Sequence, residues 1–305
     1  MTFVLQPGTV YIVGAGPGAA DLITVRGRAA IEAADLLLYA DSLVDPAHGE
    51  YAKPGARILG SSGLTLDQLT ALMVEAARRG EIVVRLHSGD PSIYGAMHEQ
   101  LMALRAAGVP VEIVPGVNSA LAAAAALGVE LTVPELAQAV IMTRASGRAG
   151  KIPERESLRL LAAHGSTLAL FLSASLIDRA VADLIAGGYG PETPAAIAYR
   201  VSWADERLVR CSLQEVPEAM RAAGITRQCL VLVGAALGAG ISAADARSHL
   251  YDPAYGHRYR EALTPQPPIS CTGSEADSFR AASQSRTCRQ PGNEPCHPEG
   301  HTNAG

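Results

Sequence analysis

The sequence G-D-P-S-I-Y-G, from Gly89 to Gly95, lies between an apolar strand predicted at residues 82–86 and an amphipathic helix expected to follow directly. In α/β proteins, ligands bind at the carboxyl ends of such strands. Pro91 suits the first turn of a helix, Asp90 is placed to cap it, and Gly89 lets a ligand approach the backbone. The stretch predicts an α/β fold and a site for an anionic or dipolar small molecule. A capped helix start without a ligand is the alternative.

Two further loops repeat this arrangement of strand, turn and helix. The sequence G-A-G-P-G, from Gly14 to Gly18, follows a strand predicted at 9–13. The sequence P-G-V-N-S, from Pro115 to Ser119, follows a strand predicted at 111–114 and precedes a helix of small residues. Three such loops in one chain favour a ligand site over three unrelated helix starts.

The first of these loops raises another possibility. With Ala19 it matches G-x-G-x-x-[G/A], the fingerprint of dinucleotide-binding proteins, so an NAD-dependent Rossmann oxidoreductase is an alternative. Pro17 opposes it because proline removes an N–H from a loop that would hold a pyrophosphate. Asp21 would bring a carboxylate to the same phosphates. The acid expected at the end of the second strand is also missing, since Asp35 precedes that strand.

Strands and helices alternate along residues 9–127, which is typical of a mostly parallel sheet covered by helices. Thr65 and Gln68 predict a capping box, and Gly80 ends that helix. The stretch 131–138 has no clear period, so we place a domain boundary there. We expect one α/β domain at 1–130 and a second at 131–238, the latter with strands near Val140, Leu168, Ala195, Leu208 and Val231.

The character of the chain changes after residue 238. Residues 248–260 hold three tyrosines and two arginines, so we expect residues 239–263 to form an extension that docks on the body or on a partner subunit. Residues 264–305 have few large apolar side chains, and we expect a disordered tail. The tail contains cysteines and histidines with no zinc-like spacing, and we expect no metal site: Cys271, Cys288, Cys296, His297 and His301.

Composition indicates an intracellular enzyme. The chain has 305 residues, 48% of them hydrophobic, with a formal net charge of −5. The first eight residues lack a basic region, so we expect no signal peptide, and apolar runs are too short to span a membrane. Cys211 and Cys229 are expected as buried reduced thiols. We expect a cytoplasmic protein that binds neither nucleic acid nor membrane.

Taken in order, the three loops resemble those of the tetrapyrrole methylases, which use S-adenosyl-methionine and build cobalamin and sirohaem. Within that family, several segments are similar to the branch that methylates carbon 11 of precorrin-4: residues 39–44, 51–56, 85–95, 131–135, 143–148 and 202–206. The resemblance implies two α/β domains with a cofactor cleft between them, and a homodimer. It also implies a tetrapyrrole substrate, with or without cobalt.

The resemblance also implies a set of cofactor-binding residues. Those that match the family's loops are Pro17, Gly89, Asp90, Ile93, Asn118 and Ser119, while Ser173 and Val201 match loosely. Methyl transfer from a sulfonium depends mainly on positioning, so neither a catalytic triad nor a metal is expected. A non-catalytic tetrapyrrole carrier is the alternative from another functional class.

Asp41 and a group of basic residues complete the predicted site. Relatives that methylate uroporphyrinogen have an aspartate in the corresponding loop, so Asp41 is a candidate proton acceptor, although it can equally cap a turn with Ser42. The substrate is a polycarboxylate and the chain is acidic, so its attraction must be local. The cluster expected to bind the carboxylates is Arg144, Arg148 and Lys151, with Arg200 and Arg210 as further candidates.

Overall fold

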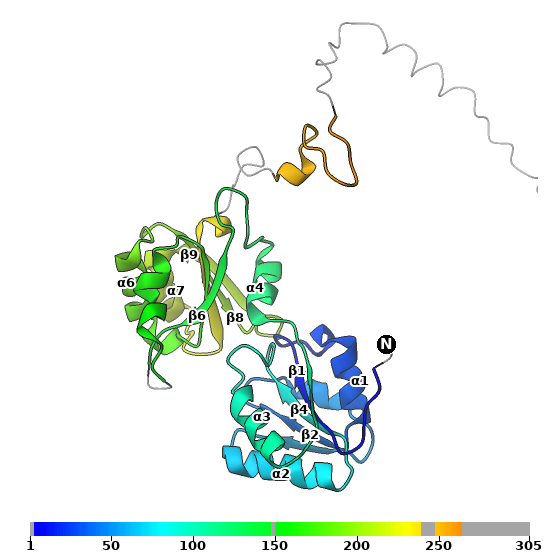
Figure 1. The fold of residues 1–305 in the computed structure, drawn as a ribbon. Coiled ribbons are helices and arrows are strands. Elements are labelled where there is room, and N and C mark those ends of the chain that lie inside the picture. The colour runs from blue at the N-terminus through cyan, green and yellow to red at the C-terminus, as the bar shows by residue number, and fades with distance from the viewer. Residues whose placement is uncertain (1–2, 148–149, 239–247, 264–305) are drawn as a thin grey trace, which may run out of the picture. The chain divides into compact units, whose positions relative to one another are not determined.

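The computed structural model describes residues 3–147, 150–238 and 248–263 (Figure 1). Contacts divide the chain into two units, Met1–Arg247 and Ser248–Gly305, and each is described by itself. The first unit contains two five-stranded sheets. This confirms the α/β class expected from the sequence.

The first sheet is entirely parallel, with the strand order β3-β2-β4-β1-β5. Its strands are β1 (Val10–Gly14), β2 (Leu36–Tyr39), β3 (Arg57–Gly60), β4 (Val83–His87) and β5 (Val111–Val114). Because β4, β1 and β5 are neighbours, the three loops singled out in the sequence leave adjacent strands at one edge of the sheet.

Helices cover both faces of this sheet (Figure 1). They are α1 (Val25–Ala33) on one face, and α2 (Leu66–Arg78) and α3 (Met97–Ala106) on the other. The predicted capping box is present: Thr65 Oγ1 accepts from the Gln68 N–H, and Gln68 Oε1 accepts from the Thr65 N–H. The residues expected to face the core from α2 include Leu69, Met73 and Ala76, which are buried.

The helix predicted to start at Pro91 begins six residues later, so that prediction was wrong. Residues 91–96 form a turn in which Tyr94 (φ 55°) and Ala96 (φ 48°) have left-handed backbones. Gly95 packs so tightly that a Cβ there would lie 2.5 Å from the Pro91 carbonyl oxygen. Asp90 therefore closes this turn and does not cap α3.

The second sheet is mixed, with the order β6-β7-β10-β8-β9, and only β6 and β7 are parallel. Its strands are β6 (Val140–Arg144), β7 (Thr167–Phe171), β8 (Pro194–Tyr199), β9 (Arg207–Ser212) and β10 (Cys229–Val233). The helices α5 (Leu158–Ala162), α6 (Ile177–Gly187) and α7 (Val216–Ala222) share one buried cluster with it. All five strands fall where the sequence predicts them.

The helix α4 (Ser119–Leu127) packs on the opposite face of the second sheet. Its alanines lie against the small side chains of Ala169 and Ala196, which lets the helix approach the sheet closely. Packing thus groups α4 with the second sheet, although the sequence places it in the first domain. Short 3₁₀ helices occupy several connections: Ala20–Leu22, Pro46–Tyr51, Glu154–Glu156, Ala174–Leu176, Leu213–Glu215 and Ala235–Leu237.

In the second unit the structure describes residues 248–263, which include a 3₁₀ turn at His249–Tyr251. The Arg260 guanidinium donates to the carbonyls of Leu250, Asp252 and Tyr255, and so holds the segment together. Tyr259 is 84% exposed within it, and the docking role of this segment stays a prediction. The predicted tail, with its cysteines and histidines, lies outside the described residues. Among those described, no helix has the length and hydrophobicity of a membrane span.

Candidate active site

Three glycines bring the predicted loops into direct contact. A Cβ at Gly14 would lie 2.5 Å from the Gly116 Cα, and one at Gly116 would collide with the Gly89 carbonyl oxygen. Gly16 and Gly89 also exchange backbone hydrogen bonds of 3.2 and 2.7 Å. No larger residue fits at Gly14 or Gly116, so the loops after β1, β4 and β5 form one packed edge.

The Asp90 side chain joins two of these loops. Its Oδ1 accepts from the Ser92 N–H at 2.8 Å, and its Oδ2 accepts from the Gly116 N–H at 2.9 Å. Partial burial opposes ionisation of Asp90, but the two N–H donors outweigh it and hold the pKa below its ordinary value. Asp90 is therefore an ionised carboxylate fixed at the edge of the sheet.

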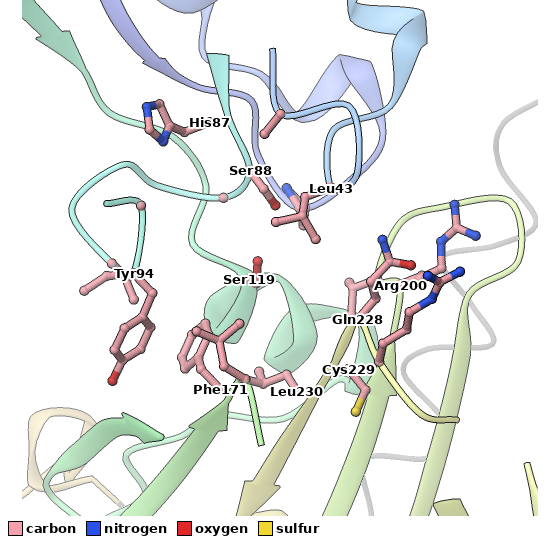
Figure 2. Close-up of a pocket in the computed structure, with 18 of the residues that line it drawn as sticks. Leu43, His87, Ser88, Tyr94, Ser119, Phe171, Arg200, Gln228, Cys229 and Leu230 are labelled. Carbon is pink, nitrogen blue, oxygen red and sulfur yellow. The ribbon is translucent and has the colours of Figure 1, made fainter. Parts of the chain in front are cut away.

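A cavity of about 540 Å³ opens beside this edge and is lined from both sheets (Figure 2). Its size is typical of a small-molecule site. Its wall is mostly apolar, with Leu43, Tyr94, Phe171 and Leu230 among the labelled residues (Figure 2). Seven of the eight predicted cofactor residues line it: Pro17, Gly89, Asp90, Ile93, Asn118, Ser119 and Val201.

Ser173, the eighth predicted residue, is placed differently. Its side chain is 2% exposed and does not line the cavity. The hydroxyl donates to the Phe171 carbonyl and accepts from the Ala145 N–H, both at 2.7 Å. These bonds tie the end of β7 to the end of β6, so the Ser173 side chain supports the loop that carries the lining residues Leu172 and Ala174.

Asp41 lies next to the lining residue Ala40 but does not itself line the cavity. Its carboxylate accepts from the hydroxyl and the backbone N–H of Ser62, at 2.6 and 2.7 Å. These two hydrogen bonds lower the pKa of Asp41. Its turn partner is thus Ser62, and not Ser42 as the alternative interpretation expected.

Of the predicted basic cluster, Arg144 and Lys151 do not line the cavity. Lys151 is exposed, and Arg148 lies outside the described residues. Arg144 ends β6 close to Tyr94: burial raises the pKa of Tyr94, and the Arg144 charge opposes that rise. Arg210 does not line the cavity: its guanidinium donates to the carbonyls of Leu127 and Leu237 and so fixes the end of α4.

The structure adds Arg85 to the residues of the candidate site. Arg85 begins the segment 85–95 that resembles the family, but no role was expected for it. It lines the cavity and is 6% exposed, with its guanidinium donating to Ser61 Oγ at 2.9 Å and Gln100 Oε1 at 3.3 Å. Among the described residues, no carboxylate forms an ion pair with it. Burial lowers the pKa of Arg85 to about 10, against the opposing effect of the Asp41 charge, so it stays cationic near neutral pH. In the sequence, the signal that could have identified Arg85 was its charge within an otherwise apolar strand.

His87 lines the same wall two residues further along β4. Burial and the neighbouring Arg85 charge lower its pKa to about 3, so the imidazole is neutral. Its Nε2 has no hydrogen-bond partner among the described residues. This wall therefore offers one buried cation and one unpaired ring nitrogen.

Three hydrogen bonds connect the loops of the second sheet to those of the first. The Trp203 indole N–H donates to the Pro17 carbonyl at 3.1 Å, and the Ala19 N–H donates to the Ser202 hydroxyl at 2.9 Å. The Gln228 amide donates to the Ser42 carbonyl at 2.7 Å. The Pro17 loop thus binds the opposite sheet, a role that local sequence patterns do not show.

Comparison with known proteins agrees with this geometry. The family model of the tetrapyrrole (corrin/porphyrin) methylases matches residues 9–217. The chain belongs to the tetrapyrrole methylases. A cobalt-precorrin-4 C(11)-methyltransferase of Methanocaldococcus jannaschii is 49% identical over 83% of this chain and 96% of that protein. A precorrin-4 C(11)-methyltransferase of a Sinorhizobium species is 45% identical over 83% of this chain and 98% of its own length.

Solved structures of other tetrapyrrole methylases have the same fold. A cobalt precorrin-4 methyltransferase, 46% identical, superposes with a TM-score of 0.74 and covers 76% of this chain and 97% of that one. A uroporphyrin-III C-methyltransferase of Thermus thermophilus in complex with S-adenosylhomocysteine is 30% identical, with a TM-score of 0.60. It covers 74% of this chain and 97% of that one. The family expected from the loops is confirmed, and the dinucleotide-binding alternative is disfavoured.

Proposed function

We propose that this chain methylates carbon 11 of precorrin-4, or of its cobalt complex, with S-adenosyl-methionine as methyl donor, in cobalamin biosynthesis. The observation that carries the proposal is that relatives named for this reaction are 45 and 49% identical and are covered almost end to end. The alternative within the family is a different position on a corrin or sirohaem precursor. We also propose a cytoplasmic homodimer, as expected from the sequence and the resemblance.

The cavity fits S-adenosyl-methionine, which when bound supplies an electrophilic methyl group on a sulfonium. Apolar side chains such as Ile93 and Val201 would exclude water from it, and the ionised Asp90 attracts cationic or hydroxyl groups of a ligand. The residues that would hold the cofactor are Pro17, Gly89, Asp90, Ile93, Asn118, Ser119 and Val201, with Ser173 supporting their neighbours. Catalysis by these groups is mainly positioning.

Arg85 supports a carboxylate-bearing substrate. A buried cation without an ion-pair partner is costly, and an anion that enters the cavity relieves that cost. Guanidinium groups bind carboxylates through paired hydrogen bonds, so an acidic side chain of the tetrapyrrole is the matching partner. Arg144, beside the lining residue Tyr94, is a further contact for these side chains in this proposal.

Methylation of a ring carbon leaves a cationic macrocycle that must lose a proton. Asp41 is the carboxylate that would accept this proton in our proposal, since it follows the lining residue Ala40. The Ser62 hydrogen bonds keep Asp41 ionised, which a proton acceptor requires, although its lowered pKa limits its basicity.

The test is a product analysis. The purified chain, S-adenosyl-methionine and either precorrin-4 or its cobalt complex should give one methylated product, which mass spectrometry detects and carbon NMR assigns to carbon 11. A methyl group at another carbon would support the alternative within the family. Calorimetry with S-adenosylhomocysteine and NAD separates the remaining classes: tetrapyrrole binding without either cofactor or turnover would indicate a carrier.

A further inference from the structure

The wall that the second sheet contributes to the cavity carries two arginines. Arg200 follows β8, Arg227 lies two residues before β10, and both line the cavity. The Arg200 N–H donates to the Gln228 carbonyl at 3.1 Å, continuing the pairing of the two strands. Arg200 therefore lies opposite Gln228, the residue that follows Arg227, and Figure 2 shows Arg200 and Gln228 at the opposite end of the cavity from Tyr94.

Arg200 is held in a defined position. Its guanidinium carbon lies 4.1 Å from the centre of the Trp203 ring, and one of its terminal nitrogens pairs with Asp205 at 2.8 Å. Trp203 is itself anchored by the hydrogen bond to the Pro17 carbonyl. The Nε of Arg200 is buried and has no hydrogen-bond partner among the described residues. One donor of a preoriented guanidinium thus lacks an acceptor.

The backbone here is also unusual. Arg200 has a φ of 45° and Gln228 a φ of 52°, conformations that non-glycine residues rarely adopt. Such strain persists where surrounding structure enforces it, and it concentrates at binding sites. The hydrogen bonds to Ser42 and Pro17 supply that enforcement from the opposite sheet.

Arg227 is exposed, and no acidic side chain of the described residues forms an ion pair with it. Asp205 pairs with Arg200, so Arg227 is the cation at this end of the cavity that has no ion-pair partner among the described residues. In a chain with a net charge of −5, such a cation is a local feature. Two guanidinium groups at one wall match carboxylates better than they match any other common biological group except phosphate.

We propose that Arg200 and Arg227 form a carboxylate subsite for acidic side chains of the tetrapyrrole, with Trp203 as the positioning residue for Arg200. This inference rests on the proposed function. Arg85 lines the same cavity from the first sheet, so the substrate is held by guanidinium groups from both sheets. Substrates with fewer carboxylates at the matching edge bind more weakly.

The first test compares Arg200→Gln and Arg227→Gln with Arg105→Gln, a matched control at an exposed position of α3 away from the cavity. Each subsite variant should raise the KM for precorrin-4 about tenfold or more, the loss expected for one charge-assisted hydrogen bond. The control should keep the wild-type KM, and all three should keep the wild-type dissociation constant for S-adenosylhomocysteine. Wild-type KM values in both subsite variants would overturn the proposal.

The second test separates positioning from direct contact. Trp203→Leu should raise the KM as Arg200→Gln does, and the combined variant should be no worse than either alone, because both changes remove the same contact. Trp203→Phe keeps an aromatic face under the guanidinium and should retain most of the affinity. Additive effects of Trp203→Leu and Arg200→Gln would refute the positioning role.

A binding measurement distinguishes failure of the subsite from failure of the proposed function. Uroporphyrin, a tetrapyrrole polycarboxylate, and its methyl ester are titrated by fluorescence quenching. Arg200→Gln and Arg227→Gln should weaken binding of the acid and leave the ester unchanged. If this holds while the wild-type protein methylates neither form of precorrin-4, the subsite stands and the proposed reaction fails. If methylation occurs but acid and ester bind all variants alike, the subsite fails.

Discussion

Replacement of Asp90 by alanine removes the side chain that joins two loops of the site. Its two oxygens accept from the Ser92 and Gly116 N–H groups at 2.8 and 2.9 Å. Gly116 belongs to the loop that leads through Asn118 into α4. Loss of the carboxylate therefore frees the loop after β5 from the loop after β4, and we expect both stability and cofactor affinity to fall.

The magnitude follows from these two bonds. A hydrogen bond to a charged group contributes about 1.5–3 kcal/mol, so two would give about 3–6 kcal/mol if fully buried. Asp90 is only half-buried, and water replaces part of what is lost. We therefore expect Asp90→Ala to lower the free energy of unfolding by about 2 kcal/mol. The dissociation constant for S-adenosylhomocysteine should rise about ten- to a hundredfold, because the loop must be ordered again on binding.

The assays are urea denaturation and titration calorimetry. Asp90→Asn keeps the shape, but its amide nitrogen must face one of the two N–H donors, so its effect should approach that of alanine. Asp67→Ala, in the exposed first turn of α2, is the matched control and should shift stability by less than about 1 kcal/mol. A folded Asp90→Ala protein with unchanged cofactor affinity would refute the assignment of Asp90 to the site.

Three further predictions concern the rest of the chain. Gly116→Ala should abolish cofactor binding, because a Cβ there collides with the Gly89 carbonyl. Titration calorimetry measures this loss, and a wild-type affinity would contradict the contact between the loops. The side-chain hydrogen bond from Lys53, at 2.6 Å, lowers the pKa of Asp35, so Asp35 stabilises the fold above the ordinary aspartate pKa of about 3.9 and this contribution is lost as pH falls. Asp35→Asn should therefore be less stable than wild type near neutral pH and converge with it in acid; a constant difference at all pH values would exclude the ionised pair. A chain stopped after Leu263 should keep wild-type activity and melting temperature, since the residues beyond it have few large apolar side chains.

Local patterns in the sequence carried much of the fold. The capping box at Thr65 and Gln68 depends on residues three apart, and its geometry is as expected. The glycine loops could be placed because each follows an apolar strand of four or five residues in the structure. Six of the eight expected cofactor residues line one cavity for the same reason, since they follow the adjacent strands β1, β4 and β5; a seventh, Val201, lines it from the second sheet.

Contacts between distant residues were beyond such patterns. The second oxygen of Asp90 binds Gly116, 26 residues away, and Asp90 does not cap the next helix, which begins at Met97. Arg210 appeared to be a free cation, but it binds the end of α4 from a strand 83 residues further on. Arg85 could be noticed as a charge inside an apolar strand, yet only the structure shows that it is buried beside Ser61 and Gln100 and that no carboxylate of the described residues forms an ion pair with it.

The backbone conformation indicates the position of the site independently of side-chain chemistry. Seven non-glycine residues of the described chain have φ between 45° and 66°. Five of them line the cavity: Tyr94, Ala96, Leu172, Arg200 and Gln228. A sixth, Ser202, lies between the lining residues Val201 and Trp203, and its hydroxyl accepts a hydrogen bond from the Ala19 N–H. Such conformations are uncommon in L-residues and persist only where neighbouring contacts enforce them, so their concentration here indicates that the loops are shaped for a ligand at some expense of stability.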